Sequence, residues 1–298
     1  EARRTSRRVY AKIQIACTHE LANVPFLPVP FNLAEKFHEM VRLDVRGYLG
    51  CWIFGNYPSL MTAVAGELSF GPEADPEHVL RRVAARLYGP ASVEATVTGW
   101  RRLGEAFRRF PLSQSVLYLG PVHYAPIWHY PLDPENRPPE RYWLVHGPAD
   151  MSDSLDWAKL DCERKSERMI YDGPVRATEV LQAFSDLSRG WDDGLADLAR
   201  SAAAASPGKR RRAERDMGVA RAAGQHFRST VRLMAFLLAR PRYLAGEAGA
   251  GDQLAEIVAG ELADRREFLA LARADSRIGF HSEFRYSFRP EDIERSIG

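Results

Sequence analysis

The chain has 298 residues, and 45% of them are hydrophobic, so it can bury a substantial core and is long enough for two domains. Its 41 Lys and Arg residues nearly balance its 39 Asp and Glu residues, and a formal charge of +2 argues for neither a nucleic-acid partner nor a membrane surface. No apolar run reaches the roughly 18 residues that a membrane-spanning helix requires.

The cysteines and the start of the chain give little information on compartment. Cys17, Cys51 and Cys162 are scattered and have no CxxC spacing, so the sequence predicts neither a disulfide framework nor a zinc site. The chain begins with Glu1, without Met and without the basic-then-apolar pattern of a signal peptide. We therefore expect that an upstream portion is missing. Localisation stays open, with the cytoplasm slightly favoured because no signal peptide is visible.

The first predicted element is a strand within residues 9–17. Lys12 and Gln14 alternate with isoleucines, which is the two-residue period of a strand. The strand ends in polar residues, among them His19 and Glu20, and a proline-rich loop follows. Polar residues at the carboxyl end of a strand, followed by a long loop, are typical of active sites in open α/β sheets and β/α barrels. The alternative is an edge strand with one solvated face, whose turn happens to contain these two residues.

The next two elements complete a βαβ unit. Residues 31–41 have apolar positions at helical spacing, and residues 47–54 form a short apolar run that is typical of a buried strand. A strand, a helix and a strand over this distance predict two parallel strands, whose carboxyl ends lie at the same edge. Glu20 is therefore expected near three further side chains, Trp52, Asn56 and Tyr57.

The rest of the chain has a mainly helical pattern. Asp75-Pro76-Glu77 is typical of a helix N-terminus, and Gly89 is a stop signal. Six segments carry apolar residues at helical spacing: 58–67, 75–89, 93–110, 175–198, 217–238 and 254–272. The last three predict a helical bundle. We interpret the basic run at 209–212 as solvated surface rather than as a nucleic-acid site.

Two irregular segments could contribute to a site. The loop at 113–147 is rich in proline and aromatic residues, which favours an ordered loop that lies over another part of the protein. Its aromatic side chains could pack the loop onto its own domain, or a few of them could line a pocket. The tail after residue 275 could return to the site or could cap the last helix.

The remaining signals favour carbohydrate chemistry. The sequence contains no GxGxxG after a strand and no GxxxxGK[ST], HExxH or GxSxG motif, so it predicts no nucleotide, no metal and no other cofactor. Aromatic rings stack on sugar C–H faces, and carboxylates, amides and imidazoles bind sugar hydroxyls. Cleavage of a glycosidic bond needs two carboxyl groups at a fixed separation.

Three stretches resemble parts of known glycoside hydrolases. The junction between a (β/α)8 barrel and a C-terminal helical domain resembles the run GNYPSLMTAVAGELSFGPEADPEHVLRRVAARLYG. A late barrel strand with its loop resembles AKIQIACTHELANVPFLPVP. The end of the helical domain resembles DSRIGFHSEF. Hexosaminidase-like, O-GlcNAcase-like and α-glucuronidase-like enzymes share this arrangement. The resemblance implies an α/β fold with the last strands of a (β/α)8 (TIM) barrel at 1–70 and a helical domain at 71–298. Residues 47–54 would be the last barrel strand and 9–17 the one before, with the earlier strands absent from this chain.

This resemblance implies a glycosidase that acts on a terminal sugar, with Glu20 as the catalytic carboxylate. An ammonium at Lys12 would favour the ionised form of the Glu20 carboxyl group. An ionised Glu20 would suit a nucleophile, a base or a hydroxyl acceptor better than a general acid. The predicted sugar-binding residues are Lys12, Gln14, His19, Trp52, Asn56, Tyr57, His123, Tyr124, Trp128, His281 and Glu283. The second carboxyl group is expected upstream, so the fragment can lack activity of its own. The sugar, the linkage, retention or inversion, and the oligomeric state stay open.

Two alternatives predict different proteins. In the first, the chain is a non-catalytic carbohydrate-binding or structural protein on a degenerate barrel, and Glu20 only anchors its loop through backbone hydrogen bonds. In the second, the C-terminal half is a helical interaction module that the βαβ unit supports. The second alternative predicts a large exposed apolar patch on the helices.

Overall fold

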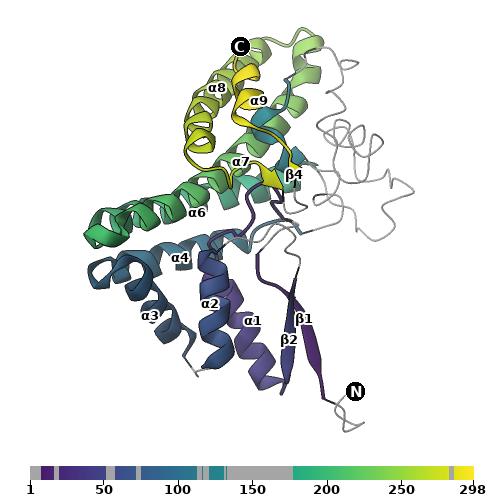
Figure 1. Cartoon of the computed structure of the whole chain (residues 1–298). Coiled ribbons are helices and arrows are strands. Elements are labelled where there is room, and N and C mark those ends of the chain that lie inside the picture. Colours follow the sequence, from purple (N-terminus) through teal and green to yellow (C-terminus); the bar gives the residue numbers. More distant parts are fainter. Residues whose placement is uncertain are drawn as a thin grey trace. The chain divides into compact units, whose positions relative to one another are not determined.

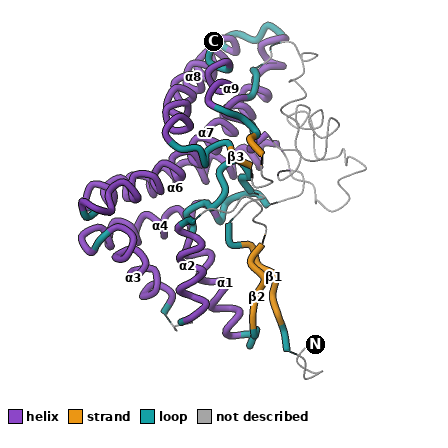
Figure 2. The backbone as a smooth tube through the Cα atoms, in the orientation of Figure 1, coloured by secondary structure: helices purple, strands orange, loops and turns teal. Residues whose placement is uncertain are grey.

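The computed structural model describes residues 8–16, 20–51, 58–71, 75–112, 116, 121–130, 132, 177–281 and 285–298. Over these residues the protein is mainly helical, with two parallel strands near the N-terminus (Figures 1 and 2). A mixed α/β fold is therefore present in this part of the chain. None of the described helices combines the length and the apolar character that crossing a membrane requires.

The elements up to residue 274 follow the predicted order, whereas two short strands and a short helix in the tail were not predicted. The strands and α-helices are β1 (Tyr10–Gln14), α1 (Pro30–Arg42), β2 (Gly47–Cys51), α2 (Leu60–Phe70), α3 (Pro76–Tyr88), α4 (Val93–Phe107), α6 (Ala177–Ala204), α7 (Arg210–Leu244), α8 (Ala250–Ala274), β3 (Phe280–His281), β4 (Arg285–Tyr286) and α9 (Pro290–Arg295). Short 3-10 turns are η2 (Pro90–Ser92), η4 (Pro121–His123), η5 (Ala125–Ile127) and η7 (Pro207–Lys209).

The element boundaries differ from the predictions mainly at their ends. β1 is shorter than the predicted 9–17, and α6 and α7 are both longer than predicted, so that only residues 205–209 separate them. Pro207 lies in this short break, since a proline cannot supply the N–H that a continuous helix needs. The N-terminal signal before α3 is confirmed, because the Asp75 side chain accepts a hydrogen bond from the Glu77 N–H at 2.9 Å.

The described chain forms two compact units. The first unit consists of Glu1–Arg108, Gly190–Arg221 and Phe280–Arg285, and the second of Arg109–Arg189, Ala222–Gly279 and Tyr286–Gly298. Each unit is a compact group of residues, and this compactness does not identify either unit as a barrel portion or a helical domain. The division into a barrel portion at 1–70 and a helical domain at 71–298 stays a prediction.

The first unit contains the predicted βαβ motif. β1 and β2 pair in parallel, with a register that runs from Tyr10 opposite Gly47 to Gln14 opposite Cys51, which confirms the predicted parallel strands. α1 and α2 lie along the strand pair in Figure 1, and the hydroxyl oxygens of Tyr48 in β2 and Ser69 in α2 are 2.8 Å apart. The Phe37 ring of α1 packs edge-on against Tyr48 of β2 at 5.0 Å between ring centres.

The helices of the first unit pack closely on one another. α1 contacts α2, α3 and α4, and α3 contacts α4. The Trp191 indole N–H of α6 donates to the Ala220 carbonyl of α7 at 2.9 Å. Gly89 ends α3 with a φ of 106°, a left-handed conformation that favours glycine, and its N–H donates to the Ala85 carbonyl.

The second unit has an aromatic core. Its fully buried phenylalanines come from three helices and from the segment before α9: Phe184, Phe227, Phe236, Phe268 and Phe288. α8 contacts both η5 and α9. The apolar stripes that predicted α6, α7 and α8 therefore do face a core, as expected for amphipathic helices.

Candidate active site at the end of the strand pair

Two of the predicted site residues lie in direct contact. The side-chain amide of Gln14, at the carboxyl end of β1, donates from Nε2 to Oε2 of Glu20 at 2.6 Å. Both side chains are half-buried, so one side of the pair faces solvent. The carboxylate therefore lies at the end of a parallel strand, where α/β proteins place their reacting groups.

The loop that follows Glu20 is well packed. Residues 21–30 are all buried, and the Phe26 N–H donates to the Ala16 carbonyl at 2.8 Å, which folds the loop back onto the end of β1. Phe26 has a φ of 68°, a left-handed conformation that costs a non-glycine residue about 1–3 kcal/mol. Backbone strain of this kind is often found at functional sites, where the surrounding structure enforces it.

The strand end is also tied to the helix that follows. Lys36 of α1 donates from Nζ to the backbone carbonyl of Gln14 at 3.1 Å. The strand pairing, the loop and α1 thus all restrain the backbone from which the Gln14 side chain projects. The Gln14 and Glu20 pair therefore lies on a rigid scaffold.

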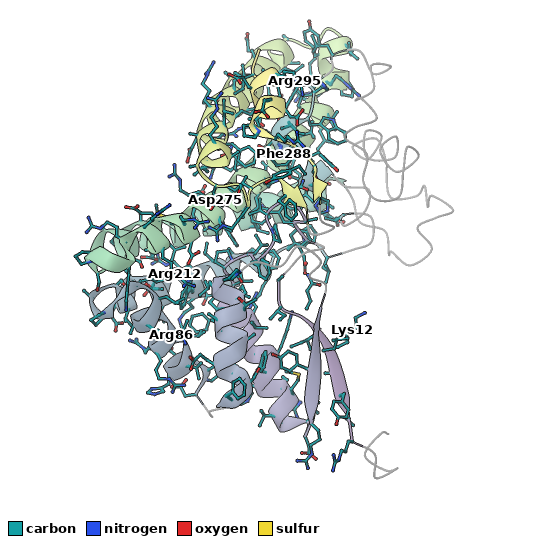
Figure 3. All side chains as sticks on the ribbon, viewed as in Figure 1. Lys12, Arg86, Arg212, Asp275, Phe288 and Arg295 are labelled. Carbon is teal, nitrogen blue, oxygen red and sulfur yellow. The ribbon has the colours of Figure 1, made fainter. Side chains whose placement is uncertain are left out.

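Lys12 lies on the same strand face as Gln14, because the two residues are separated by the strand period. Its side chain is exposed, and Figure 3 shows it on the side of β1 away from α1 and α2. Leu49 is opposite Lys12 in the register and is 64% exposed, and Tyr10 on the same face is 66% exposed. This face of the strand pair thus combines an ammonium with exposed apolar side chains.

Several predicted residues cannot be placed. His19, Trp52, Asn56, Tyr57 and Glu283 lie outside the described residues, and His281 belongs to β3 without a described side chain. The expected neighbourhood of Glu20 and Trp52 therefore stays a prediction.

The aromatic loop residues lie in the second unit. His123, Tyr124 and Trp128 are all buried, at 3% exposure or less. Their burial supports the interpretation that the loop packs onto its own domain. Their role in sugar binding stays a prediction.

The second unit contains a buried ion pair that the sequence did not reveal. Glu261 and Arg265 lie one turn apart on α8, and Arg265 Nε donates to Glu261 Oε1 at 2.9 Å. Ser229 of α7 donates its hydroxyl to the same oxygen at 2.9 Å. Burial raises the pKa of Glu261 above that of an ordinary glutamate, while the interactions with Arg265 and Ser229 lower it in part.

Arg265 connects three parts of the second unit. Its Nη1 donates to the Ser296 carbonyl after α9 at 2.9 Å, and its Nη2 donates to the Trp128 carbonyl after η5 at 2.6 Å. Its guanidinium carbon lies 5.5 Å from the centre of the Tyr130 ring. Each nitrogen of this arginine thus has a partner within the protein, which indicates a structural role. The spacing of Glu261 and Arg265 is visible in the sequence, but most pairs with this spacing are exposed.

His226 of α7 is a second buried polar residue that the sequence analysis missed. Its Nδ1 lies 3.0 Å from the Val122 carbonyl, and because a carbonyl only accepts, Nδ1 must carry the proton. Nε2 then presents a lone pair, and it has no hydrogen-bond partner in the part of the chain that the structure describes. Burial among rings such as Phe268 lowers the pKa of His226 to about 3, so the imidazole is neutral at pH 7.

The described residues hold no group of three or more His, Cys, Asp or Glu side chains that could bind a metal ion. No protein-family model, no curated protein and no solved structure matches the chain.

Proposed function

We propose that this chain is part of a glycoside hydrolase that acts on a terminal sugar, with Glu20 as a catalytic carboxylate. The observation that carries the proposal is the hydrogen bond between Gln14 and Glu20 at the carboxyl end of a parallel strand. Because Oε2 accepts from an amide N–H, the carboxylate is held as an acceptor. In this proposal Glu20 acts as a nucleophile, a base or a hydroxyl acceptor rather than as the general acid.

In this proposal, β1 and β2 are the last two strands of a (β/α)8 barrel. Parallel sheets are usually covered on both faces, and in the described residues one face of this pair meets α1 and α2 through Tyr48, which contacts Phe37 and Ser69. The other face carries the exposed Tyr10 and Leu49. Such a face is suited to the packed interior of a barrel that further strands complete. The second carboxyl group, which protonates the leaving oxygen, would lie on one of those strands.

The test is a Glu20→Gln variant of the intact protein, assayed with a panel of 4-nitrophenyl glycosides of hexoses, N-acetylhexosamines and hexuronic acids. We expect kcat to fall by about 10²- to 10⁴-fold, since the amide can neither accept a proton nor attack. Glu39→Gln is the matched control, because Glu39 is an exposed glutamate on α1 that pairs with Arg42. Turnover of the Glu20 variant at the control's rate would contradict the proposal, as would an intact protein that cleaves none of the glycosides.

A non-catalytic sugar-binding protein is the alternative that this assay separates. It predicts sugar affinity without turnover in the intact protein. In that alternative Glu20 anchors its loop through backbone hydrogen bonds. Among the described residues, the hydrogen bond found for its carboxylate is with the Gln14 side chain.

A helical interaction module receives less support. It predicts a large apolar patch on the C-terminal helices. Among the described residues of α6, α7 and α8, the exposed large apolar side chains are Tyr243 and Leu244, both at the end of α7. Two neighbouring side chains at one helix end do not form an extended patch.

A further inference from the structure

We propose that Gln14 is a positioning residue that holds the Glu20 carboxylate, rather than a ligand of the sugar. This inference rests on the proposed role of Glu20 in glycoside hydrolysis. The sequence analysis predicted that Gln14 binds substrate. The structure instead places its amide nitrogen 2.6 Å from Glu20 Oε2.

The chemistry of the two groups gives this hydrogen bond one direction. An ionised carboxylate only accepts, and an amide carbonyl only accepts, so the amide nitrogen of Gln14 must face Glu20. A hydrogen bond from a neutral donor to a carboxylate is about twice as strong as one between neutral groups. Gln14 Nε2 therefore already donates to Glu20 in the absence of a sugar.

Gln14 can act as a positioning group because its own backbone is restrained. It pairs with Cys51 in the strand register, and its carbonyl accepts from Lys36 Nζ at 3.1 Å. Glu20, by contrast, begins a loop, and a free glutamate side chain has three rotatable bonds to order. The hydrogen bond from the Gln14 amide restricts these rotations, because it fixes the position of Oε2. Oε1 is then left for the reacting sugar.

A positioning role predicts a specific kinetic change. In a Gln14→Leu variant the carboxylate keeps its chemistry and loses its orientation, so kcat should fall by about 10- to 100-fold while KM stays within about twofold. Gln182→Leu is the matched control, because Gln182 Nε2 donates to Asp186 Oδ1 at 2.9 Å on the exposed surface of α6. A raised KM with unchanged kcat would assign Gln14 to sugar binding and would overturn the proposal, as would no change in either constant.

A spectroscopic measurement tests the contact without any turnover. In protein labelled with 15N at glutamine, the side-chain NH2 protons of Gln14 at pH 7 should resonate downfield and should return upfield in Glu20→Ala. The Gln182 resonances should respond to Asp186→Ala and not to Glu20→Ala. If the Gln14 resonances do not respond to Glu20→Ala, the positioning role fails even where Glu20 is catalytic. If they respond while Glu20→Gln keeps normal turnover, the contact exists and the proposed function fails.

Discussion

Arg265 Nε lies 2.9 Å from Glu261 Oε1, one turn along α8, and both side chains are buried in the second unit. The same arginine binds the carbonyls of Ser296 and Trp128 through its two other nitrogens. A single side chain thus connects α8 with the ends of α9 and η5. Because a buried charge without its partner is costly, this relationship makes the second unit sensitive to substitution.

Arg265→Met should destabilise the protein by about 3–5 kcal/mol, because it removes the hydrogen-bonded cation beside the buried Glu261 and leaves the more distant Arg232, whose Nη1 lies 3.5 Å from Oε2. Urea unfolding followed by circular dichroism measures the change. Combining Arg265→Met with Glu261→Leu should recover part of the loss, since no unpaired carboxylate then remains. Arg42→Met is the control, because the Arg42 and Glu39 pair is exposed and should contribute nothing measurable. Equal effects of the two single substitutions would contradict the prediction.

Stability should fall as the pH decreases from about 6.5 toward 3, partly through His226. Its pKa is about 3 in the folded protein and near 6.5 when unfolded, so between these values the unfolded chain binds a proton that the folded chain does not. This difference lowers the unfolding free energy by about 1.4 kcal/mol per pH unit within that window.

A His226→Leu variant tests this linkage. It loses the hydrogen bond to the Val122 carbonyl, so it should be less stable than the wild type at pH 7. The difference in unfolding free energy between the wild type and this variant should shrink as the pH falls from 6.5 to 4. The reason is that leucine takes up no proton in the unfolded state, whereas histidine does. His38→Gln on the exposed surface of α1 controls for the removal of a histidine. A deficit that stays constant between pH 7 and pH 4 would refute the assignment.

Gly194→Ala should destabilise the first unit by about 1–3 kcal/mol, although alanine favours a helix. A Cβ at Gly194 would lie 2.6 Å from Cδ2 and 2.8 Å from Cγ of the buried Leu103, and 3.2 Å from the Gly99 carbonyl oxygen. Gly218 of α7 has open space around it, so Gly218→Ala should stabilise by about 0.5–1 kcal/mol. Thermal unfolding measures the change in Tm of each variant. Changes of the same sign in both variants would contradict the prediction that the close approach of α4 and α6 leaves no room for a Cβ at Gly194.

Much of the local structure could be predicted from the sequence. The apolar spacing of 75–89, with Asp75 before a proline and Gly89 at the end, predicted α3 almost to the residue. The alternation around Lys12 and the apolar run at 47–54 predicted two strands, and their separation predicted the parallel pairing. These features depend on interactions between residues that are close in the chain, and such interactions produce patterns that can be recognised in a short stretch of sequence.

The candidate site could be predicted only in part. The sequence placed Glu20 and Gln14 near one strand end, and the tertiary structure then decided that the Gln14 amide donates to the Glu20 carboxylate. His226 binds the carbonyl of Val122, 104 residues away, and Ser229 binds Glu261, 32 residues away. Local periodicity shows which face of a helix is apolar. Only tertiary packing decides which faces meet, and hence which buried polar groups find a partner.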